Sequence, residues 1–202
     1  FVTVDAELRS TQRIVEDVFS ETLLSPEFRA MENVGIALQA YQKDALLAAE
    51  RLVKLASVRG TPFLIRLVKG AYLETERALA EEKGWSSPVW EKKRRTDRMF
   101  DKVCSSLMKE WGCVFVSPAT HNPKNILFAE RIAREQGFLH DPHFCFQVLY
   151  GLGEPVRKAL RKRGRRVLVY APVGNLLAGM AYLARRILEN TSNQNFLFTL
   201  TR

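Results

Sequence analysis

Hydrophobic residues in this chain are concentrated in six short runs, each followed by polar or glycine-flanked residues. Apolar runs of this length are typical of strands in a sheet that is covered on both faces. Because a segment with helical spacing follows each run, the order predicts six successive strand-helix units. The predicted strands are Val2 to Asp5, Ile36 to Gln39, Phe63 to Lys69, Val114 to Asn122, Phe144 to Gln147 and Val167 to Tyr170.

The segments between these runs carry apolar residues at the three- and four-residue spacing of amphipathic helices. The third connection is longer, and a polar turn from Gly84 to Pro88 divides it into two helical pieces. The predicted helices are Ser10 to Leu24, Lys43 to Val58, Leu73 to Lys83, Glu91 to Glu110, Pro123 to Gln136, Glu154 to Arg163 and Asn175 to Asn190.

Repeated strand-helix units of this kind form either an open doubly wound sheet or an eight-stranded barrel. No G-x-G-x-x-G motif follows the first strand, and Gly151-x-Gly153 is a poor substitute, so a dinucleotide-binding sheet is disfavoured. Six strands leave a barrel unclosed, and the chain opens directly on a strand at Phe1. We expect one domain of 202 residues; if it forms a barrel, it supplies about the last six units, and two strands must come from residues outside this sequence.

Charge and cysteine content limit the types of partner and the cellular compartment that fit this sequence. The 31 basic and 22 acidic residues give a net charge of +9, much of it from Lys92 to Arg95 and Arg157 to Arg166. These clusters suit a solvated face or a negatively charged membrane surface, and no nucleic-acid-reading motif accompanies them. Three well-separated cysteines imply no disulfide framework. We expect a cytoplasmic protein, peripheral at most, because the best apolar stretch is interrupted by Arg185 and Arg186.

Two neighbouring arginines mark the last predicted helix. At about 100° per residue, one face of this helix is apolar, whereas Tyr182, Arg185, Arg186 and Glu189 share the opposite face. One interpretation is a surface helix with solvated charges. The other is a clamp for a carboxylate or phosphate, because guanidinium groups bind planar anions through two parallel hydrogen bonds.

A second candidate is Arg66, which lies inside a strongly apolar predicted strand. A buried charge requires a partner, and a structural salt bridge would satisfy it. Lys69 and Gly70 follow directly, which instead suggests an anion or cofactor approached closely by the backbone. Alternatively, Lys69 is the Schiff-base lysine of an aldolase-type barrel.

Thr120-His121-Asn122-Pro123 joins a predicted strand to a helix, where free backbone N–H groups favour a phosphate. Asn122 would equally serve as the N-cap before Pro123.

His140 and His143 have a spacing compatible with metal, but further ligands are missing. Asp5 and Gln39 end the first two strands, and Tyr170 ends the last, where each either packs at the sheet edge or lines a small-molecule pocket.

Several motifs occur in the order found in the proline dehydrogenase family. They are Ile65-Arg-Leu-Val-Lys-Gly-Ala-Tyr72, Ala119-Thr-His-Asn122, Phe146-Gln147, Tyr170-Ala-Pro-Val-Gly174 and Tyr182-Leu-Ala-Arg-Arg-Ile-Leu-Glu-Asn190. Val4-Asp5-Ala6-Glu7 and Leu38-Gln39-Ala40-Tyr41-Gln42 extend the match to the first strands. The chain therefore resembles this family, and especially the bacterial enzymes, along nearly its whole length.

The resemblance implies a distorted (βα)8 TIM-like barrel with FAD on its C-terminal face. It also implies oxidation of L-proline to Δ1-pyrroline-5-carboxylate by hydride transfer to flavin N5, with electrons passed to a membrane quinone. Arg185 and Arg186 would grip the proline carboxylate, with Tyr170 and Tyr182 beside the substrate, Asp5 closing the pocket and Arg66 near N5. The remaining FAD contacts implied by the match are Gln39, Val68, Lys69, Gly70, Ala71, Lys93, Thr120, His121, Asn122, Gln147 and Glu189.

The chain also departs from the family pattern. Leu73 replaces a common Trp, Glu91 stands where a Thr is common, and the segment from Trp85 to Trp90 differs in length. The family has two further strands before Val4-Asp5, with a Lys that pairs with the Asp and a Glu that pairs with the first Arg. A preceding segment or dimerisation is expected to close this gap. A basic module that binds anions or nucleic acid is the non-catalytic alternative.

Overall fold

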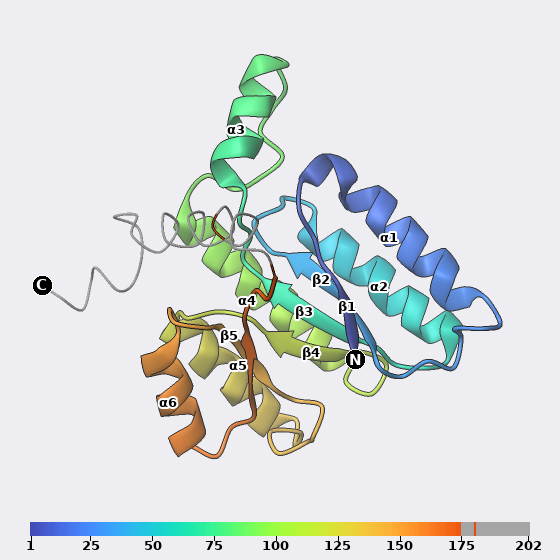
Figure 1. Cartoon of the computed structure of the whole chain (residues 1–202), viewed down its shortest axis with the longest axis vertical. Helices are drawn as coiled ribbons and strands as arrows, with labels where there is room; N and C mark the ends of the chain where they lie inside the picture. Colours follow the sequence, from blue (N-terminus) through green and yellow to red (C-terminus); the bar gives the residue numbers. More distant parts are fainter. Residues whose placement is uncertain (175–179, 181–202) are drawn as a thin grey trace, which may run out of the picture.

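The computed structural model describes residues 1–174 and 180, and in this part six strands alternate with helices (Figure 1). All the strand pairs are parallel, in the orders β1-β2-β3-β4 and β5-β6. The α/β fold class predicted from the apolar runs is confirmed, and the sheet forms an open arc of a barrel. The strands are β1 (Val2–Val4), β2 (Val34–Gln39), β3 (Leu64–Val68), β4 (Phe115–Pro118), β5 (Phe146–Leu149) and β6 (Val167–Tyr170).

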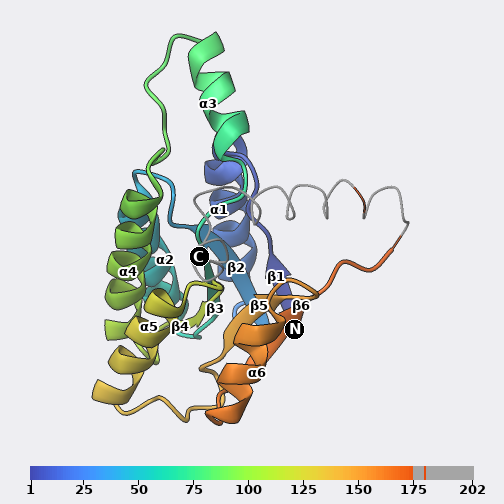
Figure 2. The ribbon, with the colours of Figure 1, turned by 90° about the vertical axis from the view of Figure 1, so that its left-hand side faces the viewer.

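The helices within the described residues follow the predicted order. Figure 2 shows α2, α4 and α5 on one side of the strands, whereas α3 extends away from the body of the molecule. The polar turn after α3 separates it from α4, as the sequence predicts. The helices are α1 (Arg9–Leu24), α2 (Ala45–Arg59), α3 (Leu73–Glu82), α4 (Lys93–Lys109), α5 (Pro123–Glu135) and α6 (Glu154–Lys162).

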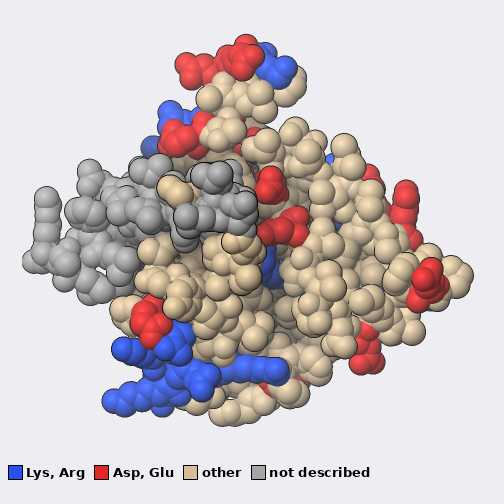
Figure 3. Space-filling model, viewed as in Figure 1, with Lys and Arg blue, Asp and Glu red and all other residues tan. Residues whose placement is uncertain are grey.

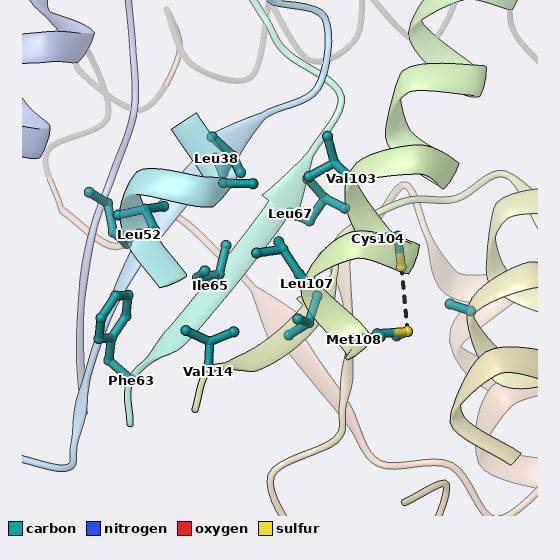
Figure 4. Packing of buried hydrophobic residues seen from close by; sticks show 14 of the residues in the cluster. Leu38, Leu52, Phe63, Ile65, Leu67, Val103, Cys104, Leu107, Met108 and Val114 are labelled. Carbon is teal, nitrogen blue, oxygen red and sulfur yellow. Dashed lines mark hydrogen bonds between the residues drawn. The ribbon is translucent and has the colours of Figure 1, made fainter. Parts of the chain in front are cut away.

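The main core lies between the central strands and helices α2 and α4 (Figure 4). Alternate residues of β3, Ile65 and Leu67, are fully buried against Val103 and Leu107 of α4. Because successive side chains of a strand point to opposite faces, Arg66 faces away from this core. The same alternation places Ala37 and Ser117, its partners in register, on the inner face of the sheet with it.

Strands β4 and β5 are joined mainly through side chains. The backbone forms one isolated bridge, between Ala119 and Gln147. Two residues earlier, Ser117 Oγ donates to the carbonyl oxygen of Cys145 at 2.8 Å. Two residues later, the N–H of Leu149 donates to His121 Nε2 at 3.0 Å. These contacts follow the same parallel register, so polar side chains replace some of the backbone hydrogen bonds of a regular ladder.

The predicted ends of two strands are wrong. Strand β4 stops at Pro118 instead of Asn122, because residues 120–122 turn to cap α5 and Pro118 has no N–H to donate. Strand β5 is shifted two residues along the chain, because Phe144 closes a turn onto the carbonyl of Asp141 before pairing with β6 begins. The other predicted elements in the described residues agree to within about two residues.

Helix α5 is fixed to the turn between α6 and β6 by an ion-pair cluster. Glu130 is 1% exposed and accepts from Arg163 and Arg165, each with a shortest N–O distance of 2.6 Å. Burial opposes ionisation of Glu130, but hydrogen bonds and charge from these two arginines outweigh it and lower the pKa of Glu130. The cluster therefore stabilises the fold with an ionised carboxylate.

None of the helices in the described residues is long and apolar enough to cross a membrane. The three cysteines are free thiols, and burial raises the pKa of each. They therefore pack as small apolar side chains with little thiolate character.

Candidate active site

Arg66 lies at the centre of the inner face of the sheet. One of its terminal nitrogens, Nη2, forms an ion pair with Asp5 Oδ1 at the end of β1. Its guanidinium also lies over the ring of Tyr170, 5.3 Å from the ring centre, at the end of β6. The salt bridge expected for a buried arginine is therefore present. Arg66, in the middle of β3, thus contacts two residues that the sequence placed at strand ends, Asp5 and Tyr170.

A second guanidinium nitrogen of Arg66, Nε, is buried and has no hydrogen-bond partner among the described residues. A buried N–H without a partner is unfavourable by about 1–3 kcal/mol. A ligand that accepts a hydrogen bond at this position would satisfy the donor.

Gln39 and the residues after β3 form the next part of the site. Gln39 is 1% exposed, and its amide donates to the carbonyl of Glu7 at 2.7 Å, so it holds the loop after β1. The carbonyls of Val68 and Lys69 accept from the N–H groups of Ala40 and Tyr41 at 2.9 and 2.7 Å. These bonds extend the β2-β3 ladder to the edge where a ligand would approach.

Gly70 makes a close approach possible at this edge. Its φ of 130° is rarely adopted by other residues, and a Cβ placed there would lie 2.4 Å from the ring of Tyr41. Ala71 follows it and is partly buried. The backbone after β3 therefore packs directly on the ring of Tyr41. The approach of an anion or cofactor to Lys69 and Gly70 stays a prediction.

Two lysines share one carboxylate beside this segment. Asp97 of α4 forms an ion pair with Lys69 through Oδ1 and with Lys93 through Oδ2, the latter at 2.8 Å. Burial lowers the pKa of Lys69, although Asp97 acts in the opposite direction. Lys93 is brought here because the segment before α4 is held at the end of β2, where Trp90 N–H donates to the carbonyl of Tyr41 at 2.7 Å.

The segment between β4 and α5 has a defined hydrogen-bonding pattern. Asn122 is the N-cap, as predicted, since its Oδ1 accepts from the N–H of Lys124 at 3.0 Å and Pro123 opens the helix. Thr120 Oγ1 accepts from the N–H of Asn122 at 3.1 Å. Burial and then the charge of Lys69 lower the pKa of His121. Its Nε2 accepts from Leu149, so the neutral ring carries its proton on Nδ1 and can donate there.

Gln147 is 9% exposed in β5, beside Ala119. The structure therefore gathers the predicted residues of all six strands at the carboxyl edge of the sheet, where α/β folds bind ligands. Tyr182, Arg185, Arg186 and Glu189 lie outside the described residues.

Sequence reasoning missed Asp97. The signal was available, because Lys93 and Asp97 have the i, i+4 spacing that brings side chains together on a helix. His140 and His143 do not form a metal site with other residues: among the described residues, no group of three or more potential metal ligands is found. His143 stacks on Phe115 and pairs with Asp141 at the opposite end of the strands.

Comparison with known families identifies the family of this chain. The sequence model described as Proline dehydrogenase matches residues 1–199. The chain belongs to the proline dehydrogenase family. Among solved structures, the chain is similar to proline utilization A (PutA) from Bdellovibrio bacteriovorus inactivated by N-propargylglycine. That structure is 39% identical with a TM-score of 0.92, and the match covers 98% of this chain and 20% of that chain.

Relatives of the proline dehydrogenase family differ in length from this chain. The bifunctional protein PutA from Salmonella typhimurium is 32% identical over 203 residues, covering 97% of this chain and 15% of the relative. Proline dehydrogenase 2 from Bacillus subtilis is 32% identical over 198 residues, covering 98% of this chain and 56% of the relative. The chain thus spans a small part of the bifunctional relatives and about half of the shorter enzyme.

Proposed function

We propose that the chain forms the catalytic part of a flavin-dependent proline dehydrogenase, which oxidises L-proline to Δ1-pyrroline-5-carboxylate. This proposal rests on Arg66, which lies on the inner face of the sheet in a chain that belongs to this family. Arg66 is held by Asp5 and Tyr170, and its buried Nε lacks a partner among the described residues.

The residues fit FAD in three respects. The unpartnered Nε of Arg66 suits the ring nitrogens of a flavin, which accept hydrogen bonds. Because Gly70 packs closely on Tyr41 and has no side chain, residue 70 places no side-chain atoms at the adjacent edge of the sheet. Lys69, Lys93 and the first turn of α5 together provide the positive charge and N–H groups that bind a diphosphate. The residues proposed to hold FAD are Gln39, Arg66, Val68, Lys69, Gly70, Ala71, Lys93, Thr120, His121, Asn122, Gln147 and Glu189.

When bound, the flavin supplies a two-electron acceptor that takes a hydride at N5. Arg66 contributes a permanent positive charge, because a guanidinium is not deprotonated in proteins. Asp5 and Tyr170 fix the orientation of that charge, so it needs no rearrangement to stabilise negative charge that develops nearby. Asp5 and Arg66 are therefore the proposed catalytic pair.

We assign substrate binding to residues that match the motifs of the family. Arg185 and Arg186 would bind the proline carboxylate through paired hydrogen bonds, with Tyr170 and Tyr182 beside the pyrrolidine ring. Holding the substrate at both its carboxylate and its ring gives one orientation, which is the main rate advantage available to a site of this kind.

Lys69 also has the lowered pKa that a Schiff-base lysine requires. Its ion pair with Asp97 and the family assignment instead favour a role in anion binding. Borohydride treatment in the presence of carbonyl compounds should therefore leave Lys69 unmodified, and a trapped adduct would support the aldolase alternative.

The deciding experiment is an anaerobic titration of the purified, FAD-loaded protein with L-proline. Bleaching of the visible flavin absorption, with formation of Δ1-pyrroline-5-carboxylate in equal amount, is expected. D-proline provides a control for the geometry of the site. A protein that binds no FAD, or whose bound flavin L-proline leaves oxidised, contradicts the proposal.

We further infer that the electrons pass to a quinone at a membrane surface. Exposed Lys and Arg side chains over α6 support a peripheral contact with anionic lipid (Figure 3). Not all of this cluster is free for such a contact, since Arg163 and Arg165 pair with Glu130 and Arg157 with Glu154. Proline-dependent reduction of a short-chain ubiquinone tests the acceptor, and co-sedimentation with anionic vesicles tests the contact.

A further inference from the structure

The carboxylate of Asp97 lies between two ammonium groups that come from different parts of the chain. Lys69 follows β3, whereas Lys93 lies on α4 one turn before Asp97. Each carboxylate oxygen serves one lysine, so neither ammonium group displaces the other. The side chains of Lys69 and Asp97 are both 23% exposed, which leaves the cluster open on one side.

The surroundings of Lys69 act on its pKa in opposite directions. Burial and the positive charge of Lys93 both lower the pKa of Lys69, and Asp97 opposes these effects. Among the described residues, the other titratable groups that interact with Lys69 are Asp101 on α4 and His121 after β4. Asp101 accepts from Asn125 at 2.7 Å, and it raises the pKa of Lys69 less than Asp97 does. Asp97 is therefore the carboxylate that most favours the charged form of Lys69.

We propose that Asp97 is a positioning residue, which holds the ammonium groups of Lys69 and Lys93 as a fixed pair that binds the diphosphate of the dinucleotide cofactor. This proposal rests on the proposed function for the identity of the ligand. Two lysines and one carboxylate leave one net positive charge, which an anionic ligand can still use. Without Asp97, the two ammonium groups would repel each other and adopt separate, flexible conformations.

The bridge can be measured without the cofactor. Amine acylation modifies only the neutral form of lysine, so brief treatment with acetic anhydride followed by mass spectrometry reports the protonation of Lys69 relative to exposed Lys83. Asp97→Asn is expected to raise the relative labelling of Lys69 several-fold. Asp97→Glu, which keeps a carboxylate, should restore much of the protection. Asp17→Asn, which breaks the exposed i, i+4 pair with Arg13, is the matched control.

The cofactor role is measured by titrating FAD into the same proteins and following flavin fluorescence. Asp97→Asn is expected to weaken FAD binding by roughly tenfold or more, because two charge-assisted contacts lose their geometry. Asp97→Glu should bind with intermediate affinity, and Asp17→Asn should match the parent protein. Circular dichroism confirms that each variant is folded.

The outcomes separate the two proposals. Unchanged labelling of Lys69 in Asp97→Asn would show that the bridge does not exist in solution. Increased labelling with unchanged FAD affinity would overturn the role of Asp97 in positioning the lysines. If the parent protein binds no FAD, the proposed function and the diphosphate assignment fail together, whereas the labelling result still decides whether Asp97 holds the lysine pair.

Discussion

The guanidinium carbon of Arg66 lies 5.3 Å from the centre of the Tyr170 ring, although the two residues belong to different hydrogen-bonded sheets. Arg66 is in β3 of the four-stranded sheet, and Tyr170 ends β6 of the two-stranded one. The contact therefore spans the inner face of the arc. Together with the ion pair to Asp5, it fixes a cation at the place where the strands converge.

Replacement of Arg66 by Lys should slow proline-dependent flavin reduction by about 100-fold, the scale seen when a single pre-oriented donor is lost from an active site. Lysine keeps the charge but has no planar fork to contact Asp5 and Tyr170 at once. Stopped-flow measurement of flavin bleaching checks this. Arg161→Lys, on the exposed face of α6, is the control for the same type of substitution and should keep the parent rate. Equal rates for Arg66→Lys and the parent protein would remove Arg66 from the catalytic role.

Replacement of Gly70 by Ala should destabilise the protein and weaken FAD binding. The new Cβ would lie 2.4 Å from the Tyr41 ring, so either the ring or the segment after β3 must move. Gly84→Ala is the matched control. Its φ is also positive, at 64°, but nothing lies within 4 Å of a Cβ there, so only the backbone effect of about 1 kcal/mol remains. Thermal unfolding and FAD titration of both variants separate the steric effect from the backbone effect.

Replacement of Glu130 by Gln should lower the free energy of unfolding by about 2 kcal/mol at neutral pH, since two arginines lose a buried charged acceptor. The pKa of Glu130 is lower in the folded protein than the value of about 4.3 in the unfolded chain. Its stabilisation is therefore complete above that value and is lost as the pH falls through the folded pKa.

The difference between parent and Glu130→Gln should accordingly shrink in acid, which urea unfolding at several pH values can measure. Glu135→Gln on the same helix is the control. Glu135 forms an exposed i, i+4 pair with Arg131, so its loss should change stability by less than about 1 kcal/mol at any pH. A pH-independent effect of Glu130→Gln would show that its charge contributes nothing.

Replacement of Arg185 by Met should raise the Michaelis constant for L-proline by tenfold or more, since the carboxylate loses one of two paired cations. FAD affinity should change little. Arg161→Met, on the exposed face of α6, is the control for removing an arginine. Steady-state kinetics with L-proline provide the measurement, and a Michaelis constant like that of the parent protein would refute the carboxylate clamp.

Much of the fold follows from local patterns, because each strand of a covered parallel sheet is a continuous apolar run. The positions of Arg66, Asn122 and Tyr170 also follow, since strand ends and helix caps have local signatures. The partners were harder to predict. Asp97 holds Lys69 across 28 positions of sequence, and Ser117 and His121 bond to the backbone of β5. Such contacts depend on how elements pack, which periodicity does not encode.

Among the described residues, β4 and β5 are joined by one backbone bridge and by the side chains of Ser117 and His121. The placement of Gln147 and Tyr170 relative to Arg66 therefore depends on two polar side chains rather than on a continuous backbone ladder. The sheet is thus encoded at this junction by side-chain chemistry, so a substitution there would alter the alignment of two parts of the candidate site.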